Sequence, residues 1–178
     1  MNVTIQQITD TTKEQFENLF NYYLYELSAY SQEDIGTKGT FEMEDISPYY
    51  KDERLYPYFI TCNEKIVGFI LVTSPPYVAN EVDYSVQELF VLPKYRGSNI
   101  AKDAVMQIFK LYPGRYEVGM FKSNLKAVKF WTKLISTLDV SVSVEDGFIE
   151  IQGNVVQTTG MKFTVSCESI DNIEKRSL

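Results

Sequence analysis

Histidine is absent from all 178 residues of this chain. Its absence excludes serine–histidine and cysteine–histidine catalysis, and any metal site built on imidazole ligands. The two cysteines, Cys62 and Cys167, form no metal-binding or redox spacing, so we expect reduced thiols and no bound metal. Any acid–base chemistry must therefore come from carboxylates, tyrosine, lysine or water.

Basic residues and long apolar runs are also scarce. The chain has 17 Lys and Arg residues against 24 Asp and Glu residues, and it shows no basic face typical of nucleic-acid binding. No apolar run approaches the ~20 residues of a membrane-spanning helix, and Met1 to Ile5 lacks the basic start and apolar core of a signal peptide. We therefore expect a single cytoplasmic domain over residues 1–178, without nucleic-acid or membrane partners.

The residues that are present alternate between β-rich and helical patterns. Helical spacing of apolar residues predicts helices at about 12–30, 100–112 and 124–138. Strand patterns cover 3–8, 56–62, 66–73, 84–92 and 115–121. In the β-rich tail, Asp146-Gly147 predicts a hairpin turn between strands at 140–144 and 148–151, followed by a strand at 161–166 and a frayed end at 171–178. This order predicts a mixed α/β sheet with helices on its faces.

A short polar turn separates the strand at 84–92 from the helix that follows it. The sequence RGSNIA occupies residues 96–101, where the helical pattern begins. The unpaired N–H groups and the positive dipole end of a helix start favour an anion, commonly a phosphate. Arg96 adds a bidentate cation, Gly97 permits a positive φ, and Ser98 or Asn99 can cap the helix. An ordinary capped helix explains the same residues, so the turn alone leaves both interpretations open.

Linked motifs give this turn a context. RGSNIA resembles the Gln/Arg-x-x-Gly-x-Gly/Ala signature of the GNAT acetyltransferase superfamily, and ELFVLPKY at 88–95 is similar to the exit of that superfamily's fourth strand. NLKAVKFW at 124–131 resembles its second motif, Asn-x-x-Ala-x-x-Phe-Tyr. The resemblance covers about residues 84–138. It has two departures: Asn99 replaces a usual glycine, and Trp131 replaces a tyrosine that commonly protonates the departing thiolate.

The resemblance implies a GNAT-like α/β (α+β) fold, with a mixed, mostly antiparallel central sheet and helices on both faces. It implies an N-acetyltransferase that uses acetyl-CoA as co-substrate, without a metal, and acetylates a primary amine of a small molecule or peptide. The motifs would lie at 84–138 and a β-rich part at 139–170. The cofactor-binding residues implied are Leu89, Phe90 and Val91 of the strand, Arg96, Gly97, Ser98, Asn99, Ile100 and Ala101 of the turn, and Asn124.

Glu88 is the candidate general base, because family members often carry an acidic residue at this strand position. An alkyl amine with a pKa near about 10.4 must lose a proton before it attacks, so a base helps. The alternative is a solvated carboxylate at the strand end. Tyr112 and Tyr116 are candidate acids outside the motif position, although a thiol of pKa about 8.5 can leave without one. Trp131 is expected to pack, because its indole N–H is not a comparable acid.

Three functions stay open at this point. The first is the N-acetyltransferase. The second is a GNAT-fold sensor or partner-binding protein that binds acyl-CoA without efficient transfer, which Asn99 and Trp131 keep open. The third is an unrelated α/β phosphate-binding domain that prefers nucleotides. No motif identifies the acceptor amine, and an exposed sheet edge is compatible with a homodimer.

Overall fold

The computed structural model describes residues 1–42 and 45–176, with side chains described up to residue 171 in the last segment. Within it, seven strands form one sheet: β1 (Val3–Gln7), β2 (Leu55–Cys62), β3 (Lys65–Thr73), β4 (Tyr84–Val91), β5 (Gly114–Phe121), β6 (Val142–Ile151) and β7 (Asn154–Val165). Four α-helices accompany the sheet: α1 (Lys13–Ser31), α2 (Ile100–Leu111), α3 (Leu125–Leu138) and α4 (Cys167–Arg176). Three short 3-10 turns complete the chain: Asp10–Thr12, Ser47–Tyr50 and Pro93–Tyr95.

The strand order is β1-β2-β3-β4-β5-β7-β6. Neighbouring strands are antiparallel except β4 and β5, which are parallel and connected through α2. A parallel pair requires such a crossover, whereas the hairpin partners need only tight turns. The predicted mixed, mostly antiparallel sheet is therefore confirmed.

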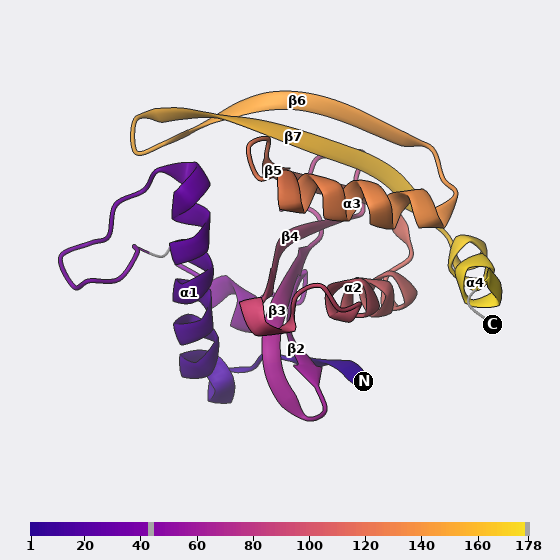
Figure 1. Ribbon diagram of the computed structural model, residues 1–178, viewed down its shortest axis with the longest axis horizontal. Helices are drawn as coiled ribbons and strands as arrows, with labels where there is room; N and C mark the ends of the chain where they lie inside the picture. The colour runs from indigo at the N-terminus through magenta and orange to yellow at the C-terminus, as the bar shows by residue number, and fades with distance from the viewer. Residues whose placement is uncertain (43–44, 177–178) are drawn as a thin grey trace.

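Helices cover both faces of the sheet, with α1 on one face and α2 and α3 on the other (Figure 1). On the α1 face, Phe16 packs edge-on against Phe69, with their ring centroids 5.2 Å apart. The neighbouring residue Ile70 points to the opposite face and joins the core formed with α2 and α3. None of the helices in the described part of the chain is long and apolar enough to cross a membrane.

Strand β4 diverges from β5 soon after it begins. The two strands pair only at Tyr84 with Tyr116 and at Ser85 with Glu117. On its other side, β4 stays paired with β3, but the register shifts so that Val86 and Glu88 have partners while Gln87 does not. Such a bulge bends the strand and re-aims its side chains. The sheet is therefore open between β4 and β5 beyond Ser85.

The predicted hairpin turn at Asp146-Gly147 is wrong. Strand β6 runs through both residues, and Gly147 pairs with Thr158 of β7. The turn lies at Gln152-Gly153, where φ is 47° and 80°. A two-residue turn with positive φ at both positions matches the twist of a hairpin, and glycine suits it. Asp146 instead places its carboxylate 2.5 Å from Nζ of Lys122.

The prediction of a frayed C-terminal end is also wrong for the residues that the structure describes. Residues 167–176 form α4, which contacts α2 and α3. Ile170 is 4% exposed and belongs to the core on that face. The helix is short and mostly polar, and this weak sequence signal explains the error. Residues 177–178 lie outside the described part.

Candidate active site

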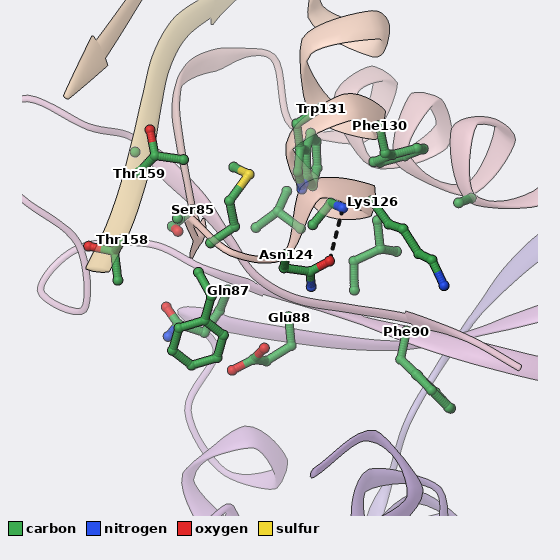
Figure 2. A pocket seen from close by; sticks show the side chains of 18 of the residues that line it. Ser85, Gln87, Glu88, Phe90, Asn124, Lys126, Phe130, Trp131, Thr158 and Thr159 are labelled. Carbon is green, nitrogen blue, oxygen red and sulfur yellow. Dashed lines mark hydrogen bonds between the residues drawn. The ribbon is translucent and has the colours of Figure 1, made fainter. Parts of the chain in front are cut away.

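A cleft of about 1660 Å³ opens where β4 separates from β5. Its walls come from α1, β4, the turn before α2, β5, α3 and the β6–β7 hairpin. Figure 2 shows Gln87 and Glu88 of β4 and Asn124 and Trp131 around this space. Its volume exceeds the ~300–1,000 Å³ of common small-molecule pockets, so two ligands can share it.

The structure brings the predicted site residues together in this cleft, with one exception. Glu88, Leu89, Phe90 and Val91, the turn residues from Arg96 to Asn99, Ala101 and Asn124 all line it. Ile100 does not, because its side chain is 1% exposed and packs into the core beneath the turn. Ile100 can therefore contribute only its backbone.

The turn before α2 leaves several amides without helical acceptors. The first hydrogen bond of α2 in this region runs from the N–H of Asp103 to the carbonyl of Asn99, at 2.8 Å. The N–H groups of Ile100, Ala101 and Lys102 therefore precede the helical ladder. Gly97 has φ 77°, the left-handed conformation that the sequence allowed for. The geometry suits an anion at the cleft-facing start of α2.

The predicted side-chain cap at this helix start is wrong. Asn99 is the N-cap residue of α2, but its side chain makes no capping hydrogen bond. The hydroxyl of Ser98 instead donates to the carbonyl of Tyr95, at 2.6 Å. Helix α3, in contrast, has a side-chain cap: Oδ1 of Asn124 accepts a hydrogen bond from the N–H of Ala127 at 3.2 Å.

Arg96 connects the turn to helix α1, on the opposite wall of the cleft. Its two Nη atoms lie 2.9 and 2.8 Å from the Glu26 carboxylate of α1, and its Nε donates to the carbonyl of Val91 at 2.6 Å. The guanidinium also lies over the ring of Phe90, 5.5 Å from its centroid. Arg96 therefore fixes the turn against α1 and β4, a role that sequence spacing alone did not indicate.

Glu88 receives a hydrogen bond from α1 as well. The hydroxyl of Tyr23 donates to Oε2 of Glu88, and both residues line the cleft. Burial raises the pKa of Tyr23 well above its ordinary value, and the negative charge of Glu88 raises it further. Sequence reasoning did not indicate this pairing, because a tyrosine at helical spacing is mostly a core residue and no local signal connects Tyr23 with Glu88, 65 residues later.

Comparisons with known proteins agree with this geometry. The model of the acetyltransferase (GNAT) family matches residues 13–135, more than half of the chain. The chain belongs to this family. No curated protein sequence matches it significantly.

Solved structures of GNAT-type enzymes share its fold at low sequence identity. Spermidine N-acetyltransferase from Vibrio cholerae, in complex with CoA and spermine, superposes with a TM-score of 0.63 at 14% identity, covering 92% of this chain and 95% of that one. An acetyltransferase from Thermus thermophilus gives 0.61 at 12% identity, covering 91% and 97%. A candidate streptothricin acetyltransferase from Bacillus anthracis, in complex with acetyl coenzyme A, gives 0.59 at 14% identity, covering 93% and 100%. Membership in the GNAT family rules out an unrelated phosphate-binding domain.

The position that often carries tyrosine in this family is occupied here by Trp131. Its side chain is 5% exposed, packs on Phe130 with ring centroids 5.2 Å apart, and lines the cleft. Tyr112 and Tyr116 do not line it. Tyr116 donates to the carbonyl of Tyr112 at 2.6 Å, and burial raises the pKa of both. The structure therefore leaves neither tyrosine in place to protonate a group in the cleft.

The two sides of the cleft of this acetyltransferase differ in the balance of their charges. Cations lie on the helices: Lys102 of α2, and Lys126 and Lys133 of α3. The sheet carries mostly carboxylates, namely Glu88 of β4, Glu117 of β5, and Glu145 and Asp146 of β6, together with one cation, Lys162 of β7. Helix α1 contributes the carboxylate of Glu26. Sequence reasoning missed this difference, because the residues come from separate elements that only the fold brings together.

Proposed function

We propose that the protein transfers an acetyl group from acetyl-CoA to a primary amine of a small molecule or peptide. The observation that carries this proposal is the difference in charge between the α2–α3 side and the sheet side of the cleft. The helix side, with the start of α2 and three lysines, suits an anionic coenzyme. The sheet side, with four carboxylates against one lysine, suits a cationic acceptor. The CoA and acetyl-CoA complexes of the Vibrio cholerae and Bacillus anthracis proteins support the choice of coenzyme.

The turn from Arg96 to Ala101 would hold the pyrophosphate through its backbone N–H groups. The amides at the start of α2 and the positive φ of Gly97 fit this role. Arg96 would contribute by fixing the turn, since its guanidinium is engaged by Glu26. Asn124 would hold the coenzyme at the start of α3 through the part of its amide that is free of the cap.

The open edge of β4 would receive the pantetheine arm. Within the described strands, β4 pairs with β5 only at Tyr84 and Ser85, so the edge from Leu89 to Val91 faces the cleft. Backbone N–H and C=O groups on such an edge require partners, and the amides of an extended ligand can supply them. A backbone N–H here can also stabilise the negative charge that develops on the thioester oxygen.

Glu88 would receive the proton that the ammonium group loses before it attacks. Its position on the re-aimed part of β4 places it in the cleft. Acetyl-CoA supplies an activated acyl group whose thiol leaves with a pKa of about 8.5, so its departure does not require a protein acid. The substitution of tyrosine by Trp131 is therefore compatible with transfer.

The direct test is release of free thiol from acetyl-CoA in the presence of primary amines. Spermidine and a lysine-containing peptide serve as the first acceptors, because one is a small amine and the other carries its amine on a larger molecule. We expect release that requires the amine and saturates with it, and a loss of about 10²-fold or more in Glu88→Gln. Glu150→Gln is the matched control, since Glu150 is exposed on β6 outside the cleft.

The second candidate is an acyl-CoA-binding protein without efficient transfer. It is favoured by the two departures from the family motifs, Asn99 and Trp131. Binding of acetyl-CoA with no amine-dependent thiol release over a broad amine panel would support this candidate and contradict the transferase. The presence or absence of amine-dependent thiol release therefore distinguishes the transferase from the binding protein.

A further inference from the structure

Tyr23 connects α1 to the carboxylate that the proposed reaction uses. Its ring is held among Phe20, Phe69 and Phe90, with centroid separations of 5.6, 5.5 and 5.8 Å. The hydroxyl at the end of this fixed ring donates to Oε2 of Glu88 inside the cleft. Aromatic packing thus gives the hydroxyl a defined position, and the carboxylate is held by it.

The direction of this hydrogen bond has a chemical consequence. Because burial and the charge of Glu88 raise the pKa of Tyr23, the hydroxyl keeps its proton at working pH and acts as the donor. A hydrogen bond accepted by an ionised carboxylate favours its charged form. The hydrogen bond therefore favours the ionised form of Glu88, which is the form that can accept a proton, and Tyr23 keeps its own proton.

We propose that Tyr23 is a positioning residue that holds Glu88 ionised and aimed at the acceptor amine. This inference rests on the proposed function, because Glu88 acts as a base only in that reaction. One proton passes from the substrate ammonium to Glu88 and then to solvent. Tyr23 keeps its own proton throughout, and no bond to its oxygen forms or breaks.

Three other carboxylates of the cleft lie beside a cation and not beside Tyr23. Glu26 is paired with Arg96, Asp146 with Lys122, and Glu145 lies 3.8 Å from Lys162. Glu117 of β5 lies in the same cleft, with no side-chain hydrogen bond or ion pair across the described residues. A difference between the wild type and Tyr23→Phe therefore reports the Tyr23 hydroxyl, because the phenyl ring preserves the aromatic packing.

The experiment is the pH profile of kcat/KM for the amine in Tyr23→Phe, together with the pKa of Glu88 measured by carbon NMR of labelled glutamate. We expect both the acidic limb and the pKa of Glu88 to rise by about one pH unit, because the ionised form loses a hydrogen bond. We expect kcat to fall by about tenfold, less than in Glu88→Gln, with KM nearly unchanged. Tyr25→Phe is the matched control, since Tyr25 lies on the same helix and lines the same cleft but is 68% exposed.

The possible outcomes distinguish a failure of the Tyr23 positioning role from a failure of the proposed acetyltransferase function. If Glu88→Gln loses activity but Tyr23→Phe keeps the wild-type profile and the wild-type pKa of Glu88, the positioning role is wrong and the proposed function stands. If Glu88→Gln keeps full activity, the base assignment is wrong, and the role of Tyr23 is overturned with it. Equal shifts in Tyr23→Phe and Tyr25→Phe would also overturn the inference.

Discussion

Two asparagines at helix starts show how one hydrogen bond distinguishes a cap from a residue that merely precedes a helix. Asn99 and Asn124 both occupy N-cap positions, at α2 and α3. Only the side chain of Asn124 accepts a backbone N–H, that of Ala127. The sequence predicted a cap at Ser98 or Asn99, because residue type alone does not reveal that Ser98 bonds backwards to Tyr95.

The stability of the two alanine variants should therefore differ. Asn124→Ala should lower the free energy of unfolding by about 1 kcal/mol, because it removes a formed cap. Asn99→Ala should change it by less than about 0.5 kcal/mol, because no capping bond is lost. Urea unfolding of the two variants measures both values. An equal loss in both would contradict the capping geometry.

Motif residues were predictable from the sequence, and their long-range partners were not. Glu88 and Asn124 lie inside short motifs whose spacing fixes the local structure, and both reach the cleft as expected. Tyr23 and Glu26 lie on a helix more than 60 residues before the groups that they contact, Glu88 and Arg96. Such contacts depend on how α1 packs on the sheet, which no local pattern specifies.

At the scale of elements, strands β5 and β7 contribute a pair of glycines to the cleft wall, so this part of the wall has no side chains. Gly119 and Gly160 are direct neighbours across the two strands, and both line the cleft. A Cβ added at Gly119 would meet no atom within 4 Å. Glycine weakens a strand, and it often marks a place where a ligand approaches closely. Gly119 and Gly160 are neighbours only because β5 and β7 pair in the sheet.

We expect Gly119→Val to impair acceptor binding without harming the fold. Valine favours a strand and its Cβ would meet no atom within 4 Å here, so we expect no fall in the free energy of unfolding. Its side chain would project into the sheet side of the cleft and raise the KM for the amine by about tenfold. Steady-state kinetics measure this KM, and calorimetry should give an unchanged affinity for acetyl-CoA. An unchanged KM, or an equal loss of coenzyme affinity, would contradict this placement of the acceptor.

The β6–β7 hairpin shows why turn chemistry misled the sequence analysis. Asp-Gly is the stronger hairpin signal, yet Asp146 and Gly147 sit inside a continuous strand, and the weaker Gln152-Gly153 makes the turn. Register decides this, because Val142 opposite Phe163 keeps β6 aligned with β7 along its full length. Pairing over ten residues outweighs a local turn preference. Helix and strand types were otherwise predicted well wherever apolar periodicity was long.

At the scale of the whole molecule, α1 lines the cleft from one face of the sheet, and α2 and α3 line it from the other. The long β6–β7 hairpin extends past α1 and α3 (Figure 1) and contributes further lining residues. Strand β6 is one of the two edge strands of the sheet and exposes Val142, Val144 and Phe148. The homodimer expected from an exposed edge stays a prediction. The central claim concerns the cleft itself, namely that the turn before α2 holds the pyrophosphate of acetyl-CoA.

Calorimetric titration with acetyl-CoA, and separately with ATP, tests this claim most directly. The variant Gly97→Glu places a negative charge at the turn, and Gly39→Glu is its matched control. The two glycines have φ values of 77° and 74°, and an added Cβ at either meets no atom within 4 Å, but only Gly97 lines the cleft. We predict micromolar binding of acetyl-CoA, tighter than that of ATP, which Gly97→Glu abolishes and Gly39→Glu retains. No binding of acetyl-CoA, tighter binding of ATP, or equal loss in both variants would contradict the claim.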